Sequence, residues 1–453
     1  MEKIIILGAA ESGVGSAILA KKKKFDVFLS DKGAIDPKYK AELLKWKIDY
    51  EEGGHTLDRL TDASLCVKSP GIPESAEVVV AIRNKGIRVI SEIEFAGKYC
   101  SSKTICITGS NGKTTTTTLI YDILKAAGYN VGLGGNIGLS FAYQVATELH
   151  DWYVLELSSF QLDGMTNFKA DIAVLTNITP DHLDRYNHDF NLYCASKFRI
   201  VQNMCKGDTF IYCKDDPRTI KHVIGNKESF SMSTLPFTAK DTLLEGAYLN
   251  QDNNIEINID GHELLIEKNK LQIFGTHNLY NIMASAMAAL RAGVDPKTIL
   301  HTIYNFKGVE HRTEIVCEKD GVLFINDSKA TNVDSVYYAL QGIERPIIWI
   351  AGGQDKGNDY SELIPQVKGK VTTLICMGLD NKKLIDSFTN IIPFIYSTSS
   401  LTEAMDKVHT VYKPGDCVLL SPACASFDLF KNYEQRGTLF KEAVHAMQPK
   451  TRE

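Results

Sequence analysis

The stretch from Thr104 to Thr115 constrains the fold of this chain most strongly, because it joins an apolar run, a glycine-containing loop and a lysine. The apolar run is typical of a buried strand, and the hydroxyl residues after the lysine open a helix. Gly109 and Gly112 let the backbone turn sharply, so its N–H groups face phosphate oxygens at the positive helix end. Lys113 is then placed to neutralise the β- and γ-phosphates, and the Thr114 hydroxyl to ligate Mg²⁺. This order predicts a nucleoside triphosphate site.

The loop departs from the complete phosphate-loop pattern at one position. That pattern has a glycine five residues before Gly112, where this chain has Ile107. The shorter form T-G-x-x-G-K-T remains, and a Gly-Ser-Asn-Gly turn alone also fits a plain strand-to-helix connection. The strand before it and the Lys-Thr after it favour ATP binding. The loop residues expected to contact ATP are Gly109, Ser110, Asn111, Gly112, Lys113, Thr114 and Thr115.

The length, charge and cysteine pattern of the chain limit the number of domains and exclude several classes of protein. A chain of 453 residues exceeds one ordinary core, so about three domains are expected. A net charge of −5 argues against a dedicated nucleic-acid binder, and the basic run 21–24 fits the solvent face of a helix end. The ten cysteines form no Cys-x-x-Cys pair, which disfavours a zinc ribbon or a disulfide framework. With no signal peptide and no run of about 18 apolar residues, we expect a cytoplasmic protein without membrane insertion.

Strand and helix patterns predict three α/β segments, at 1–95, 96–306 and 307–453. The first opens with a strand, a glycine-rich turn and a helix, and its second strand leads to Asp31. This layout is Rossmann-like, with the acid available to a ribose or uridine hydroxyl. Its glycines do not form a clean G-x-G-x-x-G, so the turn alone identifies no nucleotide.

The second segment carries the phosphate loop and apolar strands at 152–157 and 171–176. Its part 226–274 alternates short runs, which predicts antiparallel strands inserted in, or packed against, a P-loop-like α/β core. A buried helix is expected at 278–292. The third segment alternates strands and helices again, which predicts another Rossmann-like, doubly wound parallel sheet. Its expected strands are 322–326, 346–351, 371–377 and 416–420.

Two ionisable residues stand at strand ends in the second segment. Glu156 ends a buried strand, where an acid needs a partner or a cation, and His182 lies beyond the next strand. Because parallel strands bring their carboxyl ends to one edge, these residues and Thr114 predict a divalent-cation and phosphate site. A salt-bridged structural Glu156 and a merely hydrogen-bonded His182 stay open as alternatives. The spacing of Lys197 is typical of a surface lysine on a helix.

The third segment has polar strand ends of its own. Arg312 is suited to stack on a base or to clamp a phosphate. Asp327 and Lys329 follow a strand and are suited to close over a nucleotide, although each of these residues also fits an interdomain salt bridge. The loop 421–428 consists mostly of small residues, which let a substrate approach closely.

These motifs, in this order, resemble those of the bacterial Mur ligases over essentially the whole chain. They are T-G-S-N-G-K-T-T, G-G-N-I-G, E-L-S-S-F-Q-L, N-I-T-P-D-H-L-D-R, A-S-K, H-R-T-E, N-D-S-K-A-T-N and L-S-P-A-C-A-S-F-D-L-F-K-N-Y-E-Q-R-G. The central motifs are shared by the wider ligase group, including folylpolyglutamate synthases, and the last resembles the D-glutamate-adding branch. The Asn-Pro-Arg signature of diaminopimelate addition is absent. Another amide ligase of this group and a nucleotide sensor that does not ligate are the alternatives.

The resemblance implies a reaction and its cofactors. ATP would phosphorylate the carboxylate of UDP-MurNAc-L-alanine to an acyl phosphate, which the amine of D-glutamate then attacks. Two Mg²⁺ ions and Lys113 would offset the repulsion between the two anions. Thr114 would hold one ion, and Glu156, His182 and Lys197 the other. The matching lysine of the family is carbamylated, so Lys197 becomes a predicted metal ligand. The residues expected to be catalytic are Lys113, His182 and Lys197.

Matching positions also imply binding residues. Further ATP contacts would be Asn281, Arg312 and Asp327. The UDP-sugar path would be lined by Ser12, Asp31, Gly71 and Asn136. The residues expected to bind the D-glutamate side of the reaction are Lys329, Thr331, Lys356, Ser426 and Phe427. The chain departs from the family at Tyr433, where a Phe is usual, and at Glu11-Ser12 and Lys32-Gly33. We expect a monomer in which 307–453 moves as a rigid body.

Overall fold

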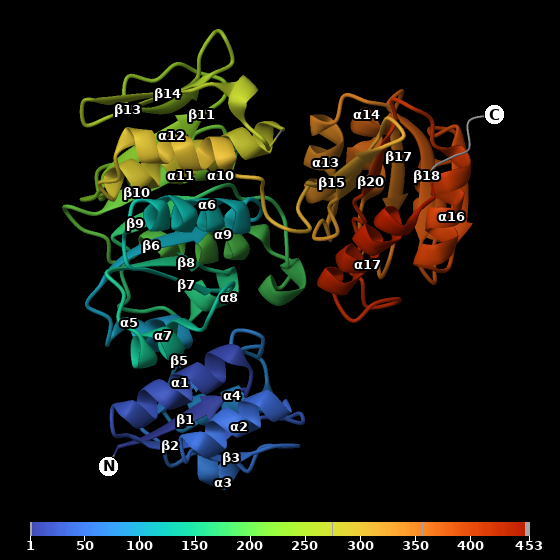
Figure 1. Cartoon of the computed structure of the whole chain (residues 1–453). Helices are drawn as coiled ribbons and strands as arrows, with labels where there is room; N and C mark the ends of the chain where they lie inside the picture. The colour runs from blue at the N-terminus through green and yellow to red at the C-terminus, as the bar shows by residue number, and fades with distance from the viewer. Residues whose placement is uncertain (1, 274, 356, 449–453) are drawn as a thin grey trace. The chain divides into compact units, whose positions relative to one another are not determined.

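The computed structural model describes residues 2–273, 275–355 and 357–448. It contains two compact units, the first made of Met1–Lys270 with Tyr280–Tyr304 and the second of Leu271–Leu279 with Asn305–Glu453. Three sheets built mainly of parallel strands confirm the predicted α/β class (Figure 1). Two sheets lie in the first unit and one in the second. The domain limits at 95 and 306 stay predictions.

The first sheet is parallel and has the strand order β3-β2-β1-β4-β5. Its strands are β1 (Lys3–Leu7), β2 (Asp26–Ser30), β3 (Asp49–Glu51), β4 (Leu65–Lys68) and β5 (Arg88–Ser91). Its helices are α1 (Glu11–Lys22), α2 (Pro37–Lys45), α3 (Leu57–Leu60), α4 (Glu77–Asn84) and α5 (Glu92–Gly97). Four lysines at 21–24 are exposed at the end of α1, as predicted. The strand order reverses between β1 and β4, and open α/β sheets bind their ligands at the carboxyl ends of strands beside such a point.

The second sheet has nine strands in the order β14-β13-β12-β11-β10-β9-β6-β8-β7. Its strands are β6 (Lys103–Thr108), β7 (Val131–Gly135), β8 (Trp152–Glu156), β9 (Ile172–Leu175), β10 (Thr209–Cys213), β11 (Ser233–Thr238), β12 (Gly246–Leu249), β13 (Ile255–Ile259) and β14 (His262–Ile266). Its helices are α6 (Lys113–Ala126), α7 (Phe141–Thr147), α8 (Ser159–Asp163), α9 (Phe190–Phe198), α10 (Pro217–Asn226), α11 (Thr276–Arg291) and α12 (Pro296–Asn305). Short 3₁₀ turns are η1 (Leu183–Tyr186), η2 (Arg199–Val201) and η3 (Lys268–Lys270).

The antiparallel strands predicted at 226–274 need a correction. β11 pairs in parallel with β10 and with β12, and only β12, β13 and β14 form antiparallel pairs. The helix α10 accounts for the difference, because it provides the crossover that a parallel β10–β11 pair requires. Asp216 caps this helix by accepting from Thr219 N at 2.7 Å, and Pro217 occupies its first turn. The added strands therefore extend the main sheet.

The third sheet lies in the second unit and has the order β15-β16-β20-β17-β18-β19. Its strands are β15 (Glu314–Lys319), β16 (Val322–Asn326), β17 (Ile347–Ala351), β18 (Val371–Met377), β19 (Phe394–Thr398) and β20 (Cys417–Leu420). Its helices are α13 (Val333–Gly342), η4 (Tyr360–Leu363), α14 (Ile364–Val367), α15 (Lys382–Phe388), α16 (Leu401–Val411) and α17 (Tyr433–Ala446). The strands β17 and β20 are wholly buried, as expected for parallel strands covered by helices on both faces.

One close helix contact, between α1 and α7, joins the parts of the first unit that carry its two sheets. A Cβ added to Gly15 of α1 would lie 2.0 Å from Ser140 Oγ, at the start of α7, so this position has no room for a side chain. Ser140 Oγ also donates to the buried Glu92 carboxylate, which accepts from Ala142 N at 3.0 Å. The glycine of the amino-terminal turn thus serves helix packing.

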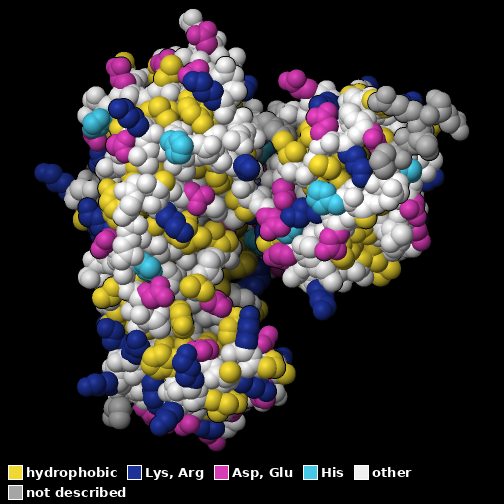
Figure 2. Space-filling view, in the orientation of Figure 1, with side chains coloured by type: hydrophobic (Ala, Val, Ile, Leu, Met, Phe, Trp, Pro, Cys, Tyr) yellow, Lys and Arg dark blue, Asp and Glu magenta, His cyan; other side chains and the backbone are white. Residues whose placement is uncertain are grey.

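The surface agrees with a modest net charge. Figure 2 shows acidic side chains interspersed with Lys and Arg over the visible face. Among the described residues, no helix is long and apolar enough to cross a membrane.

Candidate active site

The phosphate loop connects the centre of the second sheet to a helix, as predicted. It follows β6 and ends at Gly112, which precedes α6. Gly109 and Gly112 have φ angles of +149° and +82°, which L side chains rarely adopt. Space is also lacking: an added Cβ would lie 1.9 Å from Thr176 Oγ1 at Gly109 and 2.3 Å from Asn281 Oδ1 at Gly112. Both glycines are required by the loop's shape.

Residues that directly follow the neighbouring strand β9 form hydrogen bonds with this loop and hold it in place. Ser110 N donates to Asn177 O at 2.9 Å, and Asn111 N donates to Asn177 Oδ1 at 2.9 Å. Thr176 Oγ1 donates to Asn111 O at 2.6 Å. Ser110 Oγ lies 2.8 Å from Thr179 O and 2.9 Å from the Tyr193 hydroxyl. These contacts were not predictable from the sequence pattern, because they join residues that lie 65 or more positions apart.

Lys113 closes the loop on itself. Its Nζ donates to Gly109 O and to Ser110 O, both at 2.8 Å. The following Thr114 is half-buried and Thr115 is buried. Asn281 of α11 is also buried and accepts from Thr116 Oγ1 at 3.3 Å, one turn into the loop helix. The residues predicted to contact ATP in the first unit therefore lie together at the start of α6.

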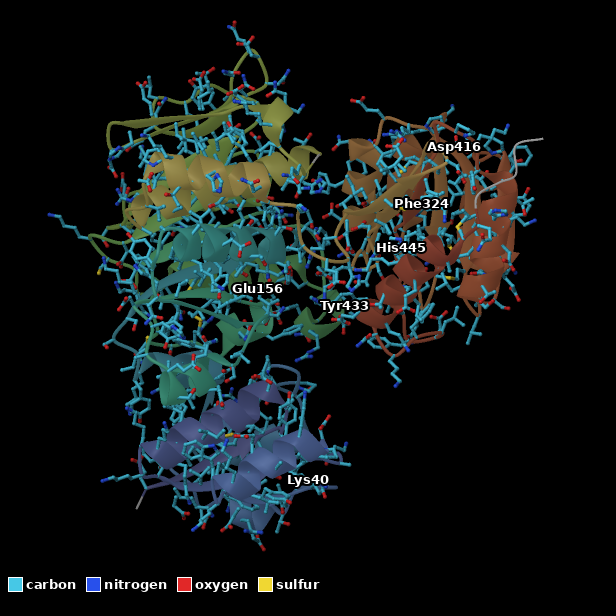
Figure 3. All side chains as sticks on the ribbon, viewed as in Figure 1. Lys40, Glu156, Phe324, Asp416, Tyr433 and His445 are labelled. Atoms are coloured by element: carbon cyan, nitrogen blue, oxygen red, sulfur yellow. The ribbon has the colours of Figure 1, made fainter. Side chains whose placement is uncertain are left out.

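Glu156 is a buried acid with one unsatisfied oxygen. It ends β8 and is 1% exposed (labelled in Figure 3). Its Oε1 accepts from Asn136 Nδ2 at 2.8 Å, and its backbone carbonyl accepts from Asn136 N at 2.8 Å. Among the residues that the structure describes, Oε2 has no hydrogen-bond partner. A buried carboxylate oxygen without a partner is costly and suits a cation. The salt-bridge alternative for Glu156 has no support in the described contacts.

Lys197 is buried, so the prediction from its helical spacing was wrong. It lies on α9, is 2% exposed, and its Nζ donates to Thr108 Oγ1 at 3.2 Å. Burial holds the pKa of its ammonium well below the usual value, and the charge of Lys113 lowers it further. Asp181 and Glu156 oppose this effect. Spacing missed the burial because Lys197 lies on the one face of α9 that is buried, together with Tyr193, Cys194 and Ser196.

His182 lies beyond β9 with a left-handed backbone, at φ +52°. Partial burial lowers the pKa of its imidazole, Asp181 raises it, and the charges of Lys113 and Lys197 lower it again. These mutual effects bring His182, Lys113 and Lys197 into one electrostatic cluster with Glu156. The sequence predicted that the strand ends would meet at this edge, and the strand order β9-β6-β8-β7 brings them side by side.

Mg²⁺ is a hard cation that binds oxygen ligands. The unsatisfied Glu156 oxygen and the Thr114 hydroxyl are suitable oxygen ligands. An amine is a poor ligand for this hard cation, so Lys197 fits only if its nitrogen carries an oxygen-bearing group. Its depressed pKa leaves the nitrogen lone pair available for such a modification.

The residues predicted to line the UDP-sugar path follow the strands β1, β2 and β4 of the first sheet and β7 of the second. Asp31 accepts from Ala9 N at 2.7 Å and from Gly33 N at 2.8 Å, directly after β2. Ser12 Oγ donates to Ser69 Oγ at 3.3 Å, and the exposed Gly71 follows β4. Asn136 lies farther along, beside Glu156.

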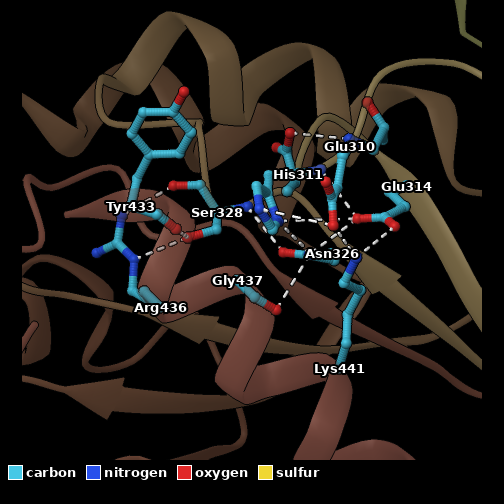
Figure 4. A network of polar contacts seen from close by, with 11 residues as sticks. Glu310, His311, Glu314, Asn326, Ser328, Tyr433, Arg436, Gly437 and Lys441 are labelled. Atoms are coloured by element: carbon cyan, nitrogen blue, oxygen red, sulfur yellow. Dashed lines mark hydrogen bonds and ion pairs between the residues drawn. The ribbon is translucent and has the colours of Figure 1, made fainter.

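Arg312 and Asp327 lie in the second unit, and their sequence neighbours His311 and Asn326 belong to the polar network that Figure 4 draws. Asp327 accepts from Thr313 N at 3.1 Å and from Ser421 Oγ at 2.7 Å. Burial raises the pKa of its carboxyl to about 7, although these bonds and the Arg312 charge act in the opposite direction. The residues on both sides of Arg312, His311 and Thr313, have positive φ angles of 64° and 41°.

Hydrogen bonds and ion pairs, some of them from the last helix α17, hold the segment 310–314 in place. We call this set of contacts the brace. Asn326 Nδ2 lies 2.9 Å from His311 Nδ1 and 2.9 Å from Glu314 Oε2. Lys441 of α17 donates to Glu314 Oε1 at 3.0 Å and to Glu310. Glu310, His311 and Glu314 have ligand atoms close enough for a metal, but the Lys441 ammonium already supplies the positive charge. Sequence reasoning missed this brace, which joins residues up to 131 positions apart.

The residues predicted for D-glutamate also lie in the second unit. Lys329 Nζ is 3.5 Å from the centre of the Tyr433 ring, and Thr331 N donates to Lys329 O at 2.9 Å. Ser426 is buried, whereas Phe427 is 66% exposed and presents an aromatic face to solvent. Lys356 lies outside the described residues.

The fold and the loop define a nucleotide-binding α/β enzyme of the P-loop kind, and comparison with known proteins narrows the class. The chain matches the MurD N-terminal domain over residues 3–78, the Mur ligase middle domain over 107–289 and the Mur ligase glutamate ligase domain over 311–424. The chain belongs to the Mur ligase family, and the resemblance stated from its motifs is confirmed. Membership implies the use of ATP.

Individual proteins agree with this assignment. A UDP-N-acetylmuramoylalanine--D-glutamate ligase from Christiangramia forsetii is 49% identical over 98% of this chain and 99% of that protein. One of the same name from Bacteroides fragilis is 48% identical over 99% of this chain and 100% of that protein. The structure of UDP-N-acetylmuramate-alanine ligase from Thermotoga maritima has a TM-score of 0.63 at 18% identity, covering 99% of this chain and 100% of that one. The last likeness supports the three-domain fold alone.

Proposed function

We propose that this chain is an ATP-dependent ligase that joins D-glutamate to UDP-N-acetylmuramoyl-L-alanine in the synthesis of peptidoglycan precursors. One observation carries the proposal: the chain is 49% identical, over nearly its whole length, to a relative named for this reaction. The site supports it, because a phosphate loop lies beside a buried acid and a buried lysine. These groups suit the transfer of a phosphoryl group to a carboxylate.

The chain's own residues would perform the first step by holding two anions together. The loop N–H groups and Lys113 bind the ATP phosphates, after Lys113 exchanges the carbonyls of Gly109 and Ser110 for phosphate oxygens. Thr114 would hold one Mg²⁺ ion, and Glu156, His182 and the modified Lys197 would hold a second, so that the remaining negative charge would be offset. The substrate carboxylate attacks the γ-phosphorus, which yields an acyl phosphate and ADP. The amine of D-glutamate then displaces phosphate and forms the amide.

The environment of Lys197 supports its proposed carbamylation. A buried lysine with a lowered pKa presents a neutral amine, which is the form that adds CO₂. The addition forms an N–C bond and releases one proton, and the product carries an anionic oxygen pair. Such a group turns an unsuitable nitrogen ligand into an oxygen ligand beside Glu156. It also removes the repulsion between Lys197 and Lys113.

The remaining binding roles belong to both units. Asn281, Arg312 and Asp327 would contact the nucleotide, and Ser12, Asp31, Gly71 and Asn136 the UDP-sugar. The proposed D-glutamate contacts are Lys329, Thr331, Lys356, Ser426 and Phe427. All of these residues belong to one chain, so we propose that a monomer acts in the cytoplasm, where ATP is available.

A coupled assay with the pathway's four amino-acid donors tests the proposal. ADP and phosphate should form only when UDP-N-acetylmuramoyl-L-alanine and D-glutamate are both present. Omission of either substrate serves as the control. Equal turnover with L-glutamate, or with a folate acceptor, would contradict the specific assignment and point to another ligase of the group.

A further inference from the structure

A chain of three polar side chains lies at the carboxyl ends of β2 and β3. Ser30, the last residue of β2, is fully buried. Its Oγ lies 2.6 Å from Glu51 Oε1 and 2.7 Å from His55 Nδ1. Glu51 Oε1 also accepts from Thr56 N at 2.9 Å. Neither the predicted ligand set nor the motifs of the sequence include this group.

The positions of the protons in the hydrogen bonds among Ser30, Glu51 and His55 follow from the chemistry of these side chains. Burial alone would raise the pKa of Glu51, but the bonds from Ser30 and Thr56 hold it below the usual value. The carboxylate is therefore ionised and only accepts, so the single Ser30 hydroxyl proton points to Glu51. The Ser30 oxygen then accepts from Nδ1–H of His55. In a neutral ring with this tautomer, Nε2 carries a lone pair.

The outer nitrogen of His55 is available to a ligand. The ring is half-buried, and Nε2 has no hydrogen-bond partner among the residues that the structure describes. The inner nitrogen is fixed by a buried hydroxyl, so the ring is held in one orientation. His55 thus presents a single oriented acceptor at the surface of the first sheet.

The position of His55 relates it to the proposed UDP-sugar path. Asp31 N donates to Glu51 O at 3.1 Å, and Gly54 N donates to Asp31 O at 3.4 Å, so the segment before His55 lies across the end of β2. The sheet order β3-β2-β1-β4-β5 places Ser12 and Gly71 on the opposite side of Asp31. In Rossmann-like sheets the acid after the second strand contacts the ribose. The proposed sugar path runs from Asp31 toward Gly71 and Asn136. It therefore leaves the other side of Asp31, where His55 lies, for the uracil base.

We propose that His55 is a specificity-determining residue that accepts a hydrogen bond from N3–H of the uracil base in the UDP moiety. The inference rests on the proposed function, which supplies a uridine nucleotide as substrate. Uracil offers one N–H donor on this edge, whereas cytosine has an acceptor lone pair at N3. A fixed acceptor therefore favours uracil, and Ser30 and Glu51 act as positioning residues through His55.

Calorimetric titration of UDP and of CDP into the full chain tests this inference. The native protein should bind UDP more tightly than CDP. His55→Ala should weaken UDP binding about tenfold and leave CDP binding nearly unchanged, since one hydrogen bond to the base is lost. His55→Gln should keep part of the preference, because its Oε1 is also an acceptor. Ser30→Ala should reduce the preference less than His55→Ala, because the ring loses only its orientation.

Equal weakening of UDP and CDP in His55→Ala, or no preference in the native chain, would overturn the inference. His262→Ala is the matched control, since His262 is exposed on β14 and should affect neither titration. Thermal unfolding of each variant checks that the chain is folded.

Ligation kinetics separate this inference from the proposed function. In His55→Ala, KM for UDP-N-acetylmuramoyl-L-alanine should rise about tenfold, while kcat and the KM for ATP stay close to native values. If the native chain shows no D-glutamate-dependent phosphate release, the proposed function fails, but the preference for UDP still tests His55. If the native chain ligates and the variant retains the native preference, the role of His55 fails alone.

Discussion

The phosphate-loop site of the first unit and the Arg312 region of the second differ in how fully their polar groups are satisfied. At the loop, Glu156 Oε2 has no partner among the described residues, and Lys113 is held by carbonyls of its own loop. Around Arg312, both Asp327 oxygens accept hydrogen bonds, and Asn326, Glu314 and Lys441 satisfy one another. A buried group without a partner costs free energy that a ligand can recover. The first region is therefore built to be completed by ligands, and the second to hold a fixed shape.

Removing Lys197 should have the largest effect. Lys197→Ala should lower ligation roughly 10³-fold, because a charged group that stabilises the reacting phosphates is lost. A small carboxylic acid such as acetate should restore part of the activity by filling the gap with oxygen atoms. Phosphate release measures both effects.

The control is Lys206→Ala, since Lys206 is exposed. Absence of ligation by the native chain, together with ATP-driven closure that Lys197→Ala retains, would favour the nucleotide sensor over the ligase. It would also show that the phosphate-loop site is not completed by ligands in the way that distinguishes it from the Arg312 region.

The pH dependence of stability should report on Asp327. Its carboxyl has a pKa near 4 when unfolded, and burial raises the pKa to about 7 in the folded chain. Between these values the folded chain retains a proton that the unfolded chain releases, so stability falls as pH rises through this window. Asp327→Asn should remove this loss, which amounts to at most about 1.4 kcal/mol per pH unit.

Urea unfolding at about pH 5 and about pH 7 measures the difference between the two proteins. Asp386→Asn, at an exposed acid on α15, is the control and should follow the native slope. Identical slopes for the native chain and Asp327→Asn would refute the assignment of this buried proton.

Adding a methyl group at Gly437, in the brace, should lower the free energy of unfolding by a moderate amount. A Cβ added to Gly437 would lie 2.3 Å from His311 Nδ1, so Gly437→Ala must displace either α17 or the ring. Such overpacking typically costs about 1–3 kcal/mol of unfolding free energy. Gly225→Ala on α10 is the control, because its Cβ would meet nothing within 4 Å. A native unfolding midpoint for Gly437→Ala would show that the brace is not tightly packed.

Breaking the ion pair of the brace should have the smallest effect. Lys441→Met removes the contacts to Glu310 and Glu314 and should raise the KM for ATP less than about fivefold, since partly exposed ion pairs contribute little. Lys441→Arg should behave as the native chain, and added salt should reduce the difference. Lys431→Met is the exposed control. An effect equal to that of Lys197→Ala would mean that the two regions do not differ as described.

The sequence predicted the parts of the fold that depend on local pattern. Continuous apolar runs identified β16, β17, β18 and β20 to within a residue, because parallel strands buried on both faces consist of such runs. The edge strands β15 and β19 were not predicted, since they are only partly buried and each offers just a short apolar run, 315–317 and 394–396.

The site was predictable only where it coincides with a motif. Lys113 and Thr114 follow from the loop pattern, and Glu156 and His182 from their places at strand ends. The burial of Lys197 depends on long-range packing, and the motif resemblance was needed to single it out. The bonds of Asn136 to Glu156 and of Ser30 to His55 join residues whose relation appears only once the strands are arranged in space.

The contact of Gly15 with Ser140 limits how this family's domains can be recombined. A chimaera that takes its first domain from a relative keeps the native fit only if Gly15, Ser140 and Glu92 come from compatible parents. Two of these residues belong to the predicted first segment and one to the second, so an exchange at residue 95 separates them. The junction of such a chimaera must therefore be chosen by the fit of these three side chains as well as by the sequence.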